Sequence, residues 1–297
     1  MKRALLLGSA LALIIAAPVQ AATKVPPLAL IALPPTIATN SSAGDEVHQL
    51  LTSPAGIFLI GTVETTTSPL VSSPTLGGSD GFVTALNPQG VKLWELRLGT
   101  PGDDVATAGF VDASGTIWVA GSSAIATGVS TPAPGLNRLT VWEISGGGLL
   151  ENTFTKDLID IDIPFSIALK GVNYIIQGAS NRTGFPGFAV SLTPIGKIGT
   201  VKNTVTAIAS SSQIFNTSSA AYGWQSYITA KALKGVTGIP ANQKTTVLIK
   251  STLKAKTMKA VYGISGVPLS LRYESGVGVV ALTQSSGTYL LTIIHTK

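Results

Sequence analysis

The chain has 297 residues, no cysteine and a formal net charge of +6, and 11% of its residues are charged while 45% are hydrophobic. The length is sufficient for a large core, and the lack of cysteine excludes disulfide frameworks, thiolate zinc sites and iron–sulfur ligands. The low charge excludes charge-rich disorder, and the 32 glycines and 17 prolines are typical of proteins built from many short strands.

The first 21 residues have the three parts of a secretory signal peptide. Lys2 and Arg3 precede the apolar run Ala4–Ala17, and Val19-Gln20-Ala21 forms a small-x-small cleavage pattern. The alternative is a membrane anchor, but 14 residues are fewer than the roughly 20 of a spanning helix. We therefore expect a signal peptide at 1–21, a short linker at 22–27, and a single domain at 28–297. The mature protein is expected to be secreted, with no membrane span.

An apolar segment followed by a tight turn recurs along the mature chain. Its copies begin at residues 81, 139, 187, 245 and 288, at intervals of 43–58 residues, and a second apolar segment precedes most of them. The segments are short and apolar at consecutive positions, which is typical of strands covered on both faces. Helical periodicity is absent from nearly all of the mature chain.

Each period contains about four short strands, as in a propeller blade. In the first period they are expected at Val47–Ser53, Gly56–Val63, Phe82–Leu86 and Lys92–Leu98. A four-stranded unit of this length cannot bury both faces alone and packs against its neighbours in a ring. The predicted fold class is all-β, a β-propeller of five four-stranded blades.

The ends of the chain suggest how the ring closes. The fifth repeat ends after its third strand, and the apolar segment Leu28–Leu33 precedes the first full repeat. Placing Leu28–Leu33 beside Tyr289–Ile294 completes the last blade and removes an exposed sheet edge. We therefore predict a propeller closed by an N-terminal strand, and we expect a monomer.

The stretch from Gly77 to Gly121 carries a family resemblance. It reads Gly-Gly-Ser-Asp-Gly-Phe-Val-Thr-Ala-Leu-Asn-Pro-Gln-Gly, then Leu98-Gly-Thr-Pro-Gly-Asp-Asp, and ends in Thr-Ile-Trp-Val-Ala-Gly. It resembles the bacterial β-propeller repeats called SBBP repeats, which occur in secreted and surface proteins. The resemblance covers these 45 residues and becomes weak in the later repeats. It implies a propeller fold and secretion, and the family has no fixed enzymatic activity.

Three acidic pairs occupy the same place in successive repeats, just before the first strand of each repeat. They are Asp45 and Glu46, Asp103 and Asp104, and Asp160 and Asp162. This connection opens onto the face where the channel of a propeller starts, so the pairs are candidate binding residues. Asp104 and Asp162 are candidate ligands of a calcium ion, which prefers oxygen ligands. The alternative is that each Asp caps its own turn through backbone N–H groups, with no cofactor.

Catalytic patterns are sparse in this sequence. Neither His48 nor His295 accompanies a Gly-x-Ser-x-Gly elbow, so we name no catalytic residue. Five-bladed propellers also include glycoside-processing enzymes, which need paired carboxylates, but no Asp or Glu occurs from Ile163 to Tyr273. We expect a non-catalytic binding or scaffolding propeller whose ligand is a cell-surface glycan or protein. The alternative is a glycoside hydrolase or lyase with carboxylates at the channel mouth.

Charge is distributed unevenly along the chain. Residues 22–150 hold 4 basic and 9 acidic residues, whereas residues 151–297 hold 14 and 5. Seven lysines and no acid occur between Lys231 and Lys259, but this stretch lacks arginine and stacking aromatic residues, so nucleic acid is not expected as a partner. Lys250, Lys254, Lys256 and Lys259 are expected to line an outer strand pair and to keep its edge from pairing with other chains. The alternative is a patch for an anionic polysaccharide. Candidate partner-binding loops are the long connections Thr65–Ser79, Ala124–Asn137 and Lys231–Gln243.

Overall fold

The computed structural model describes residues 27–33, 35–40, 44–64, 68–124, 138–158, 162–181, 183–204, 215–240 and 242–296. The predicted signal peptide lies outside this part of the chain. The described residues form the strands β1 to β22 and no helix, so the described ranges contain no helical segment able to cross a membrane. The strands assemble into five sheets, and the predicted all-β class is confirmed.

Three sheets each consist of four consecutive antiparallel strands. The first sheet contains β3 (Glu46–Ser53), β4 (Gly56–Val63), β5 (Asp80–Leu86) and β6 (Lys92–Leu98). The second contains β7 (Asp104–Val111), β8 (Ile117–Ser123), β9 (Arg138–Ile144) and β10 (Leu150–Asp157). The third contains β11 (Asp162–Lys170), β12 (Asn173–Ser180), β13 (Gly187–Leu192) and β14 (Lys202–Thr204). The four strands predicted for the first repeat are confirmed, with β3 and β5 beginning one and two residues earlier.

The other two sheets include strands from the N-terminal segment. The fourth sheet contains β15 (Phe215–Ser218), β16 (Tyr222–Thr229), β18 (Thr245–Thr252) and β19 (Met258–Ile264), extended by β1 (Leu28–Ala32) and the two-residue β17 (Val236–Thr237). The fifth sheet contains β20 (Val267–Glu274), β21 (Gly278–Ser285), β22 (Thr288–Ile294) and β2 (Ile37–Asn40). The repeat therefore yields five sheets, as predicted.

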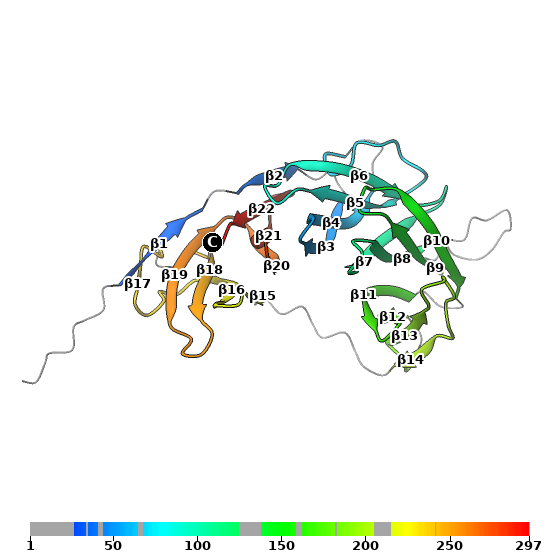
Figure 1. Cartoon of the computed structure of the whole chain (residues 1–297). Coiled ribbons are helices and arrows are strands. Elements are labelled where there is room, and N and C mark those ends of the chain that lie inside the picture. Colours follow the sequence, from blue (N-terminus) through cyan, green and yellow to red (C-terminus); the bar gives the residue numbers. More distant parts are fainter. Residues whose placement is uncertain are drawn as a thin grey trace, which may run out of the picture.

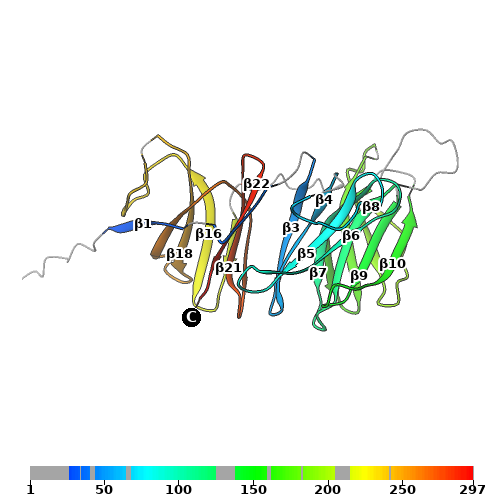
Figure 2. The same cartoon turned by 90° about the horizontal axis from the view of Figure 1, so that it is seen from above.

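The five sheets follow one another along an arc (Figures 1 and 2). The order in space is fourth, fifth, first, second and third, because β15 contacts β20, β20 contacts β3, β3 contacts β7, and β7 contacts β11. These strands are the first of their sheets, and they lie on the inner side of the arc in Figure 1. This arrangement, with first strands innermost and sheets packed face to face, is that of propeller blades.

The N-terminal strand lies in a different place from the one predicted. Leu28–Ala32 does not lie beside β22; it runs parallel to β19, with Leu30 opposite Val261. The strand that completes the fifth sheet is β2, in which Ile37 pairs with Leu291. β1 pairs with Val261, Tyr262 and Gly263 of β19, so this part of the predicted edge is paired with another strand. Both N-terminal strands lie along the outer side of the arc in Figure 1.

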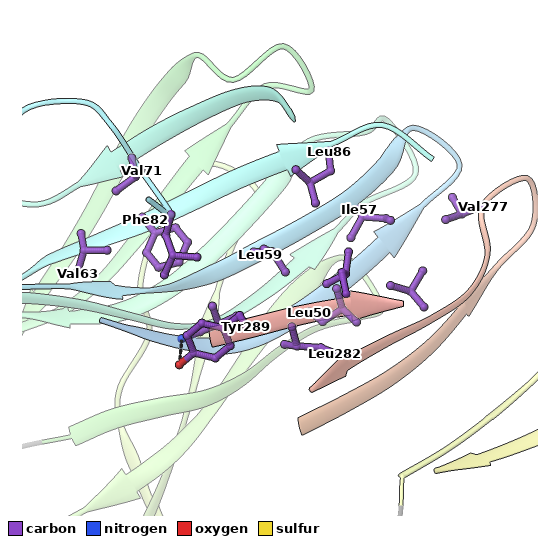
Figure 3. Packing of buried hydrophobic residues seen from close by; sticks show 14 residues of the cluster. Leu50, Ile57, Leu59, Val63, Val71, Phe82, Leu86, Val277, Leu282 and Tyr289 are labelled. Carbon is purple, nitrogen blue, oxygen red and sulfur yellow. Dashed lines mark hydrogen bonds between the residues drawn. The ribbon is translucent and has the colours of Figure 1, made fainter. Parts of the chain in front are cut away.

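Packing between the sheets explains why the strands are apolar at consecutive positions. Every residue of β4, β5 and β8 is buried, because each of these strands has a neighbouring sheet on both faces. Figure 3 shows the cluster between the fifth and first sheets, where Leu282 and Tyr289 pack against Leu50 and Leu59. Burial of a leucine of this kind stabilises the fold by roughly 1.5–3 kcal/mol.

The two ends of the arc differ from the interior sheets. The second strand of each of the first three sheets contains a glycine that packs against the first strand. The residue before this glycine is Ile60 in β4 and Ala120 in β8, and both are buried against the next sheet. The equivalent residue in β12 is Gln177, which is exposed. The third sheet thus has a partly polar outward face, as expected of a terminal unit in a repeat array.

At the other end, the fourth sheet is covered by its own chain. Val247 and Ile249 pack against Leu30 of β1 and against Leu233 and Ile239 of the connection after β16. The face that would meet another blade in a closed ring is therefore occupied by these apolar side chains. Closure of the ring by the N-terminal strand is not confirmed.

Candidate functional site

The first acidic pair lies at the start of the first sheet. Asp45 is buried; its Oδ1 accepts a hydrogen bond from the Glu64 N–H at 3.2 Å, and its Oδ2 accepts one from the Ser68 hydroxyl at 2.6 Å. Glu46 is exposed, with Oε2 3.7 Å from Nδ1 of His48. Asp45 therefore ties the start of β3 to the connection that follows β4, and these partners lie outside the turn that Asp45 itself begins.

The second acidic pair has similar contacts. Asp103 is exposed, and its Oδ1 accepts a hydrogen bond from the Ser79 N–H at 3.0 Å. Asp104 begins β7, is buried, and its Oδ2 accepts hydrogen bonds from the N–H and the hydroxyl of Thr100 at 2.6 and 2.9 Å. Both carboxylates hold the connection between the first and second sheets.

The third pair is described only in part. Asp160 lies outside the described residues, and Asp162 begins β11 without a described side chain. Within the described ranges, no group of three or more His, Asp or Glu side chains is arranged to hold a metal ion. A calcium ion between Asp104 and Asp162 stays a prediction.

A buried ion pair that the sequence analysis missed lies next to Asp104. Asp80, the first residue of β5, accepts a hydrogen bond from Nη1 of Arg97 at 2.8 Å, and both side chains are almost completely buried. The same Asp80 oxygen accepts from the Thr75 hydroxyl at 2.8 Å and the Leu76 N–H at 3.1 Å, while Arg97 donates to the Ser73 carbonyl. The signal in the sequence was a single charged residue between two leucines in β6.

Another acid joins the second and third sheets. Asp112 accepts hydrogen bonds from the N–H groups of Ser114 and Thr116, from Trp118 Nε1 at 3.0 Å and from the Tyr174 hydroxyl at 3.3 Å. Burial raises the pKa of Asp112, but the hydrogen bonds from Ser114 and Trp118 outweigh it and hold that pKa below its usual value. Burial and the Asp112 charge raise the pKa of Tyr174 to about 12. The Asp112 carboxylate is therefore ionised in neutral solution, and it links Trp118 of the second sheet to Tyr174 of the third sheet.

The inner wall of the arc is cross-linked by polar side chains. A bulge recurs near the start of four inner strands, at His48, Thr107, Phe165 and Leu269. Neighbouring inner strands are joined by hydrogen bonds from Arg272 Nε to the Leu50 carbonyl, from the Gly109 N–H to Gln49 Oε1, and from the Thr107 hydroxyl to the Pro164 carbonyl. Sequence reasoning missed these residues, because isolated polar residues in strands have no distinctive pattern.

The two histidines have structural contacts. Nε2 of His48 is 3.1 Å from the Thr62 hydroxyl, and Nδ1 of His295 is 3.0 Å from the Val277 carbonyl oxygen. Burial lowers the pKa of His48, while the nearby Glu46 opposes that shift. The neutral imidazole of His48 is therefore the form that the folded protein favours.

Two of the three long connections pack on the sheets instead of projecting as open loops. In the first, Leu70 and Val71 are buried in the cluster between the fifth and first sheets. In the third, Leu233 and Ile239 cover the fourth sheet. Most of the second connection, from 125 to 137, lies outside the described residues. The two packed connections contribute apolar side chains to the core.

The strand order and the face-to-face packing of the sheets define a β-propeller repeat protein. No family model matches the sequence, and no curated protein matches it. Among solved structures, the chain is similar to the WD40 β-propeller domain of Doa1, at 6% identity and a TM-score of 0.42, over 90% of this chain and 98% of that one.

Two carbohydrate-processing enzymes also appear among the similar solved structures. The arabinanase Arb43A of Bacillus subtilis has 11% identity and a TM-score of 0.36, over 88% of this chain and 97% of that one. The xylan β-1,4-xylosidase of Bacillus halodurans C-125 has 13% identity and a TM-score of 0.37, over 86% of this chain and 44% of that one.

Proposed function

We propose that this protein is a secreted, non-catalytic binding or scaffolding β-propeller. As a monomer, it would bind a cell-surface glycan or protein. The signal-peptide pattern at 1–21 and the resemblance of residues 77–121 to SBBP repeats support secretion by a bacterium. Binding in place of catalysis is supported by how the carboxylates are used.

The main support for this proposal is that three carboxylates at the starts of the strands are buried and already accept hydrogen bonds within the protein. A glycoside-processing enzyme needs one carboxyl as acid and a second as base or nucleophile, about 5–10 Å apart across the substrate. Asp45 accepts hydrogen bonds from the connection after β4, Asp104 accepts them from the connection between the first and second sheets, and Asp80 is paired with Arg97. All three side chains are almost completely buried, so a sugar substrate cannot reach their carboxylates.

A surface for a partner is available on the third sheet. On β11 and the turn after it, Phe165 is 45% exposed, Leu169 is 49% exposed and Val172 is 75% exposed. Grouped exposed apolar side chains are typical of interaction sites. The inner strands β3 and β7 of the first and second sheets do not expose comparable apolar side chains. The aliphatic members of this set favour a protein over a sugar as the ligand.

The test is a binding screen with matched variants. Mature protein is applied to arrays of cell-surface polysaccharides and of purified surface proteins, and release of reducing sugar from the polysaccharides is measured in parallel. We expect binding without hydrolysis, weakened at least about tenfold by Phe165→Ser with Val172→Ser, which corresponds to about 1.4 kcal/mol. Ile195→Ser, which changes an 88% exposed residue elsewhere on the same sheet, is the control. Hydrolysis would support the enzyme alternative, and equal loss in the control would remove this surface.

A further inference from the structure

A cavity of about 140 Å³ lies between the fifth and first sheets. Leu282, Tyr289 and Leu291 line it from the fifth sheet, and Leu59 and Leu86 line it from the first. These side chains belong to the apolar cluster that joins the two sheets (Figure 3). Protein interiors leave few voids larger than a water molecule, because the side chains around an empty space lose the contacts that an occupant would make. A space of this size inside an otherwise well-packed cluster is therefore a candidate ligand site.

The rim of the cavity lies on the outer strands of the two sheets. Among the residues that line it, Pro69 and Lys92 are exposed and Ile37 is half-buried. Ile37 belongs to β2 and Lys92 to β6, which are the last strands of the fifth and first sheets. Gly90 lies beneath Ile37, since a Cβ built on this glycine would be 2.8 Å from Cδ1 of Ile37. A small molecule can therefore enter between β2 and β6 without separation of the sheets.

The polar groups of the lining are already engaged within the protein. The Thr84 hydroxyl donates to the Leu70 carbonyl at 2.7 Å, and the Tyr289 hydroxyl accepts a backbone N–H at 3.0 Å. Lys92 carries the charge among the described residues of the lining, and its ammonium is paired with Glu95. An ionised ligand would lose its water here without gaining a free partner of opposite charge. The lining therefore favours a neutral, apolar molecule.

The volume limits the size of that molecule. An apolar cavity of about 150 Å³ stays dry and accepts a single benzene ring. The cavity between the fifth and first sheets is similar in size and in its aliphatic lining. Tyr289 adds an aromatic ring to the wall, and aromatic rings favour one another in offset or edge-to-face contact. A sugar does not fit this description, because its hydroxyl groups would be left without hydrogen-bond partners.

We propose that the cavity between the fifth and first sheets is a binding site for a neutral molecule with one aromatic ring. The site is separate from the apolar surface of the third sheet, so the inference does not depend on the proposed function. A bound ring contacts side chains of both sheets and strengthens the contact between them. Because it binds the folded protein, it also raises the melting temperature.

The first test is thermal unfolding of the purified protein with toluene and, separately, with benzoate. The two probes share the ring and differ in charge. At ten times its dissociation constant, toluene is expected to raise the melting temperature by about 3–6 °C in a chain of this size. Benzoate is expected to leave it unchanged. The absence of a shift with toluene up to its solubility overturns the proposal, and a shift with benzoate as large as that with toluene overturns the choice of a neutral ligand.

The second test places the probe in the cavity. Ile37→Phe adds a ring at the mouth of the cavity and is expected to abolish the toluene shift. Leu33→Phe is the matched control, because Leu33 is also half-buried in the N-terminal segment but packs on the cluster between the fourth and fifth sheets. This control should retain the toluene shift. A full shift in Ile37→Phe, or loss of the shift in both variants, would show that toluene acts elsewhere and would overturn the proposal.

A direct measurement keeps the proposal testable if a variant fails to fold. Nuclear Overhauser contacts are recorded between toluene protons and assigned methyl groups of the wild-type protein. Contacts with the methyl groups of Leu59, Leu282 and Leu291 support the site. Contacts confined to methyl groups of another cluster, such as that around Val247, overturn it.

Discussion

Leu28 and Leu30 provide a sharp test of where the N-terminal strand lies. Both side chains are half-buried in β1 and pack on the fourth sheet, over the buried residues Val247 and Val261. Ile31, which follows Leu30, is 47% exposed, because alternate residues of a strand point to opposite faces. The perturbation is the double substitution Leu28→Ala with Leu30→Ala, and Ile31→Ala is its matched control.

The expected magnitude follows from the burial of the two leucines. A fully buried Leu→Ala change costs about 2–5 kcal/mol, so a half-buried leucine should cost roughly half of that, and the pair about 2–5 kcal/mol. For a chain of this size, each kcal/mol lowers the melting temperature by about 2–4 °C. The double variant should therefore melt about 4–20 °C below wild type. Ile31→Ala should lower the melting temperature by clearly less than the double substitution, because a single side chain is shortened and 47% of Ile31 stays exposed to water in the folded protein.

The assay is thermal unfolding followed by circular dichroism, with urea unfolding to show that the m-value is unchanged. If the double variant melts with wild type, β1 does not cover the fourth sheet and the reasoning is wrong. If Ile31→Ala is as damaging as the double substitution, the strand lies with its other face inward.

Three further predictions concern single groups. Tyr289→Phe removes the hydroxyl that accepts the Val47 N–H at 3.0 Å between the fifth and first sheets, and should cost about 1–3 kcal/mol in urea unfolding because a buried donor is left unpaired; an unchanged midpoint would contradict this. Burial lowers the pKa of His48, so the free energy of unfolding should fall as pH drops below about 6.5, and His48→Gln should flatten that dependence; parallel profiles would refute it. Millimolar Ca²⁺ should leave the melting temperature unchanged, because Asp45 and Asp104 already accept hydrogen bonds within their sheets, whereas a rise that a chelator reverses would establish the calcium site.

The strands of the first repeat could be predicted because their signals are local. The run Gly56–Val63 is apolar apart from its two glycines and Thr62, and Asn87-Pro88-Gln89-Gly90 marks the turn after the next strand. Consecutive apolar residues define a strand covered on both faces whatever lies against it. The structure accordingly has β4 and β5 where the sequence predicts them. The interval of 43–58 residues between repeats, with about four strands in each, then predicted a propeller.

The placement of the N-terminal strands depended on the tertiary structure. Leu28–Leu33 and Ile37–Asn40 both precede the first repeat, and an apolar segment pairs equally well with any open edge. What decides the pairing is which edge the chain can reach. β2 ends shortly before β3, so it lies on the sheet next to the first one, and β1 continues to the sheet beyond.

The candidate site shows the same division between what the amino-acid sequence determines and what the fold adds. The order of residues along the chain was enough to place Asp45 and Asp104 just before the first strands of successive sheets. It could not show that Asp45 accepts hydrogen bonds from Glu64 and Ser68, or that Asp104 lies near Asp80, which precedes it by a whole strand. Antiparallel pairing returns the chain to the same end of the sheet, and packing of one sheet on the next then brings the two carboxylates together where water is excluded. Their proximity is a property of that contact, and no residue pattern along the chain encodes it.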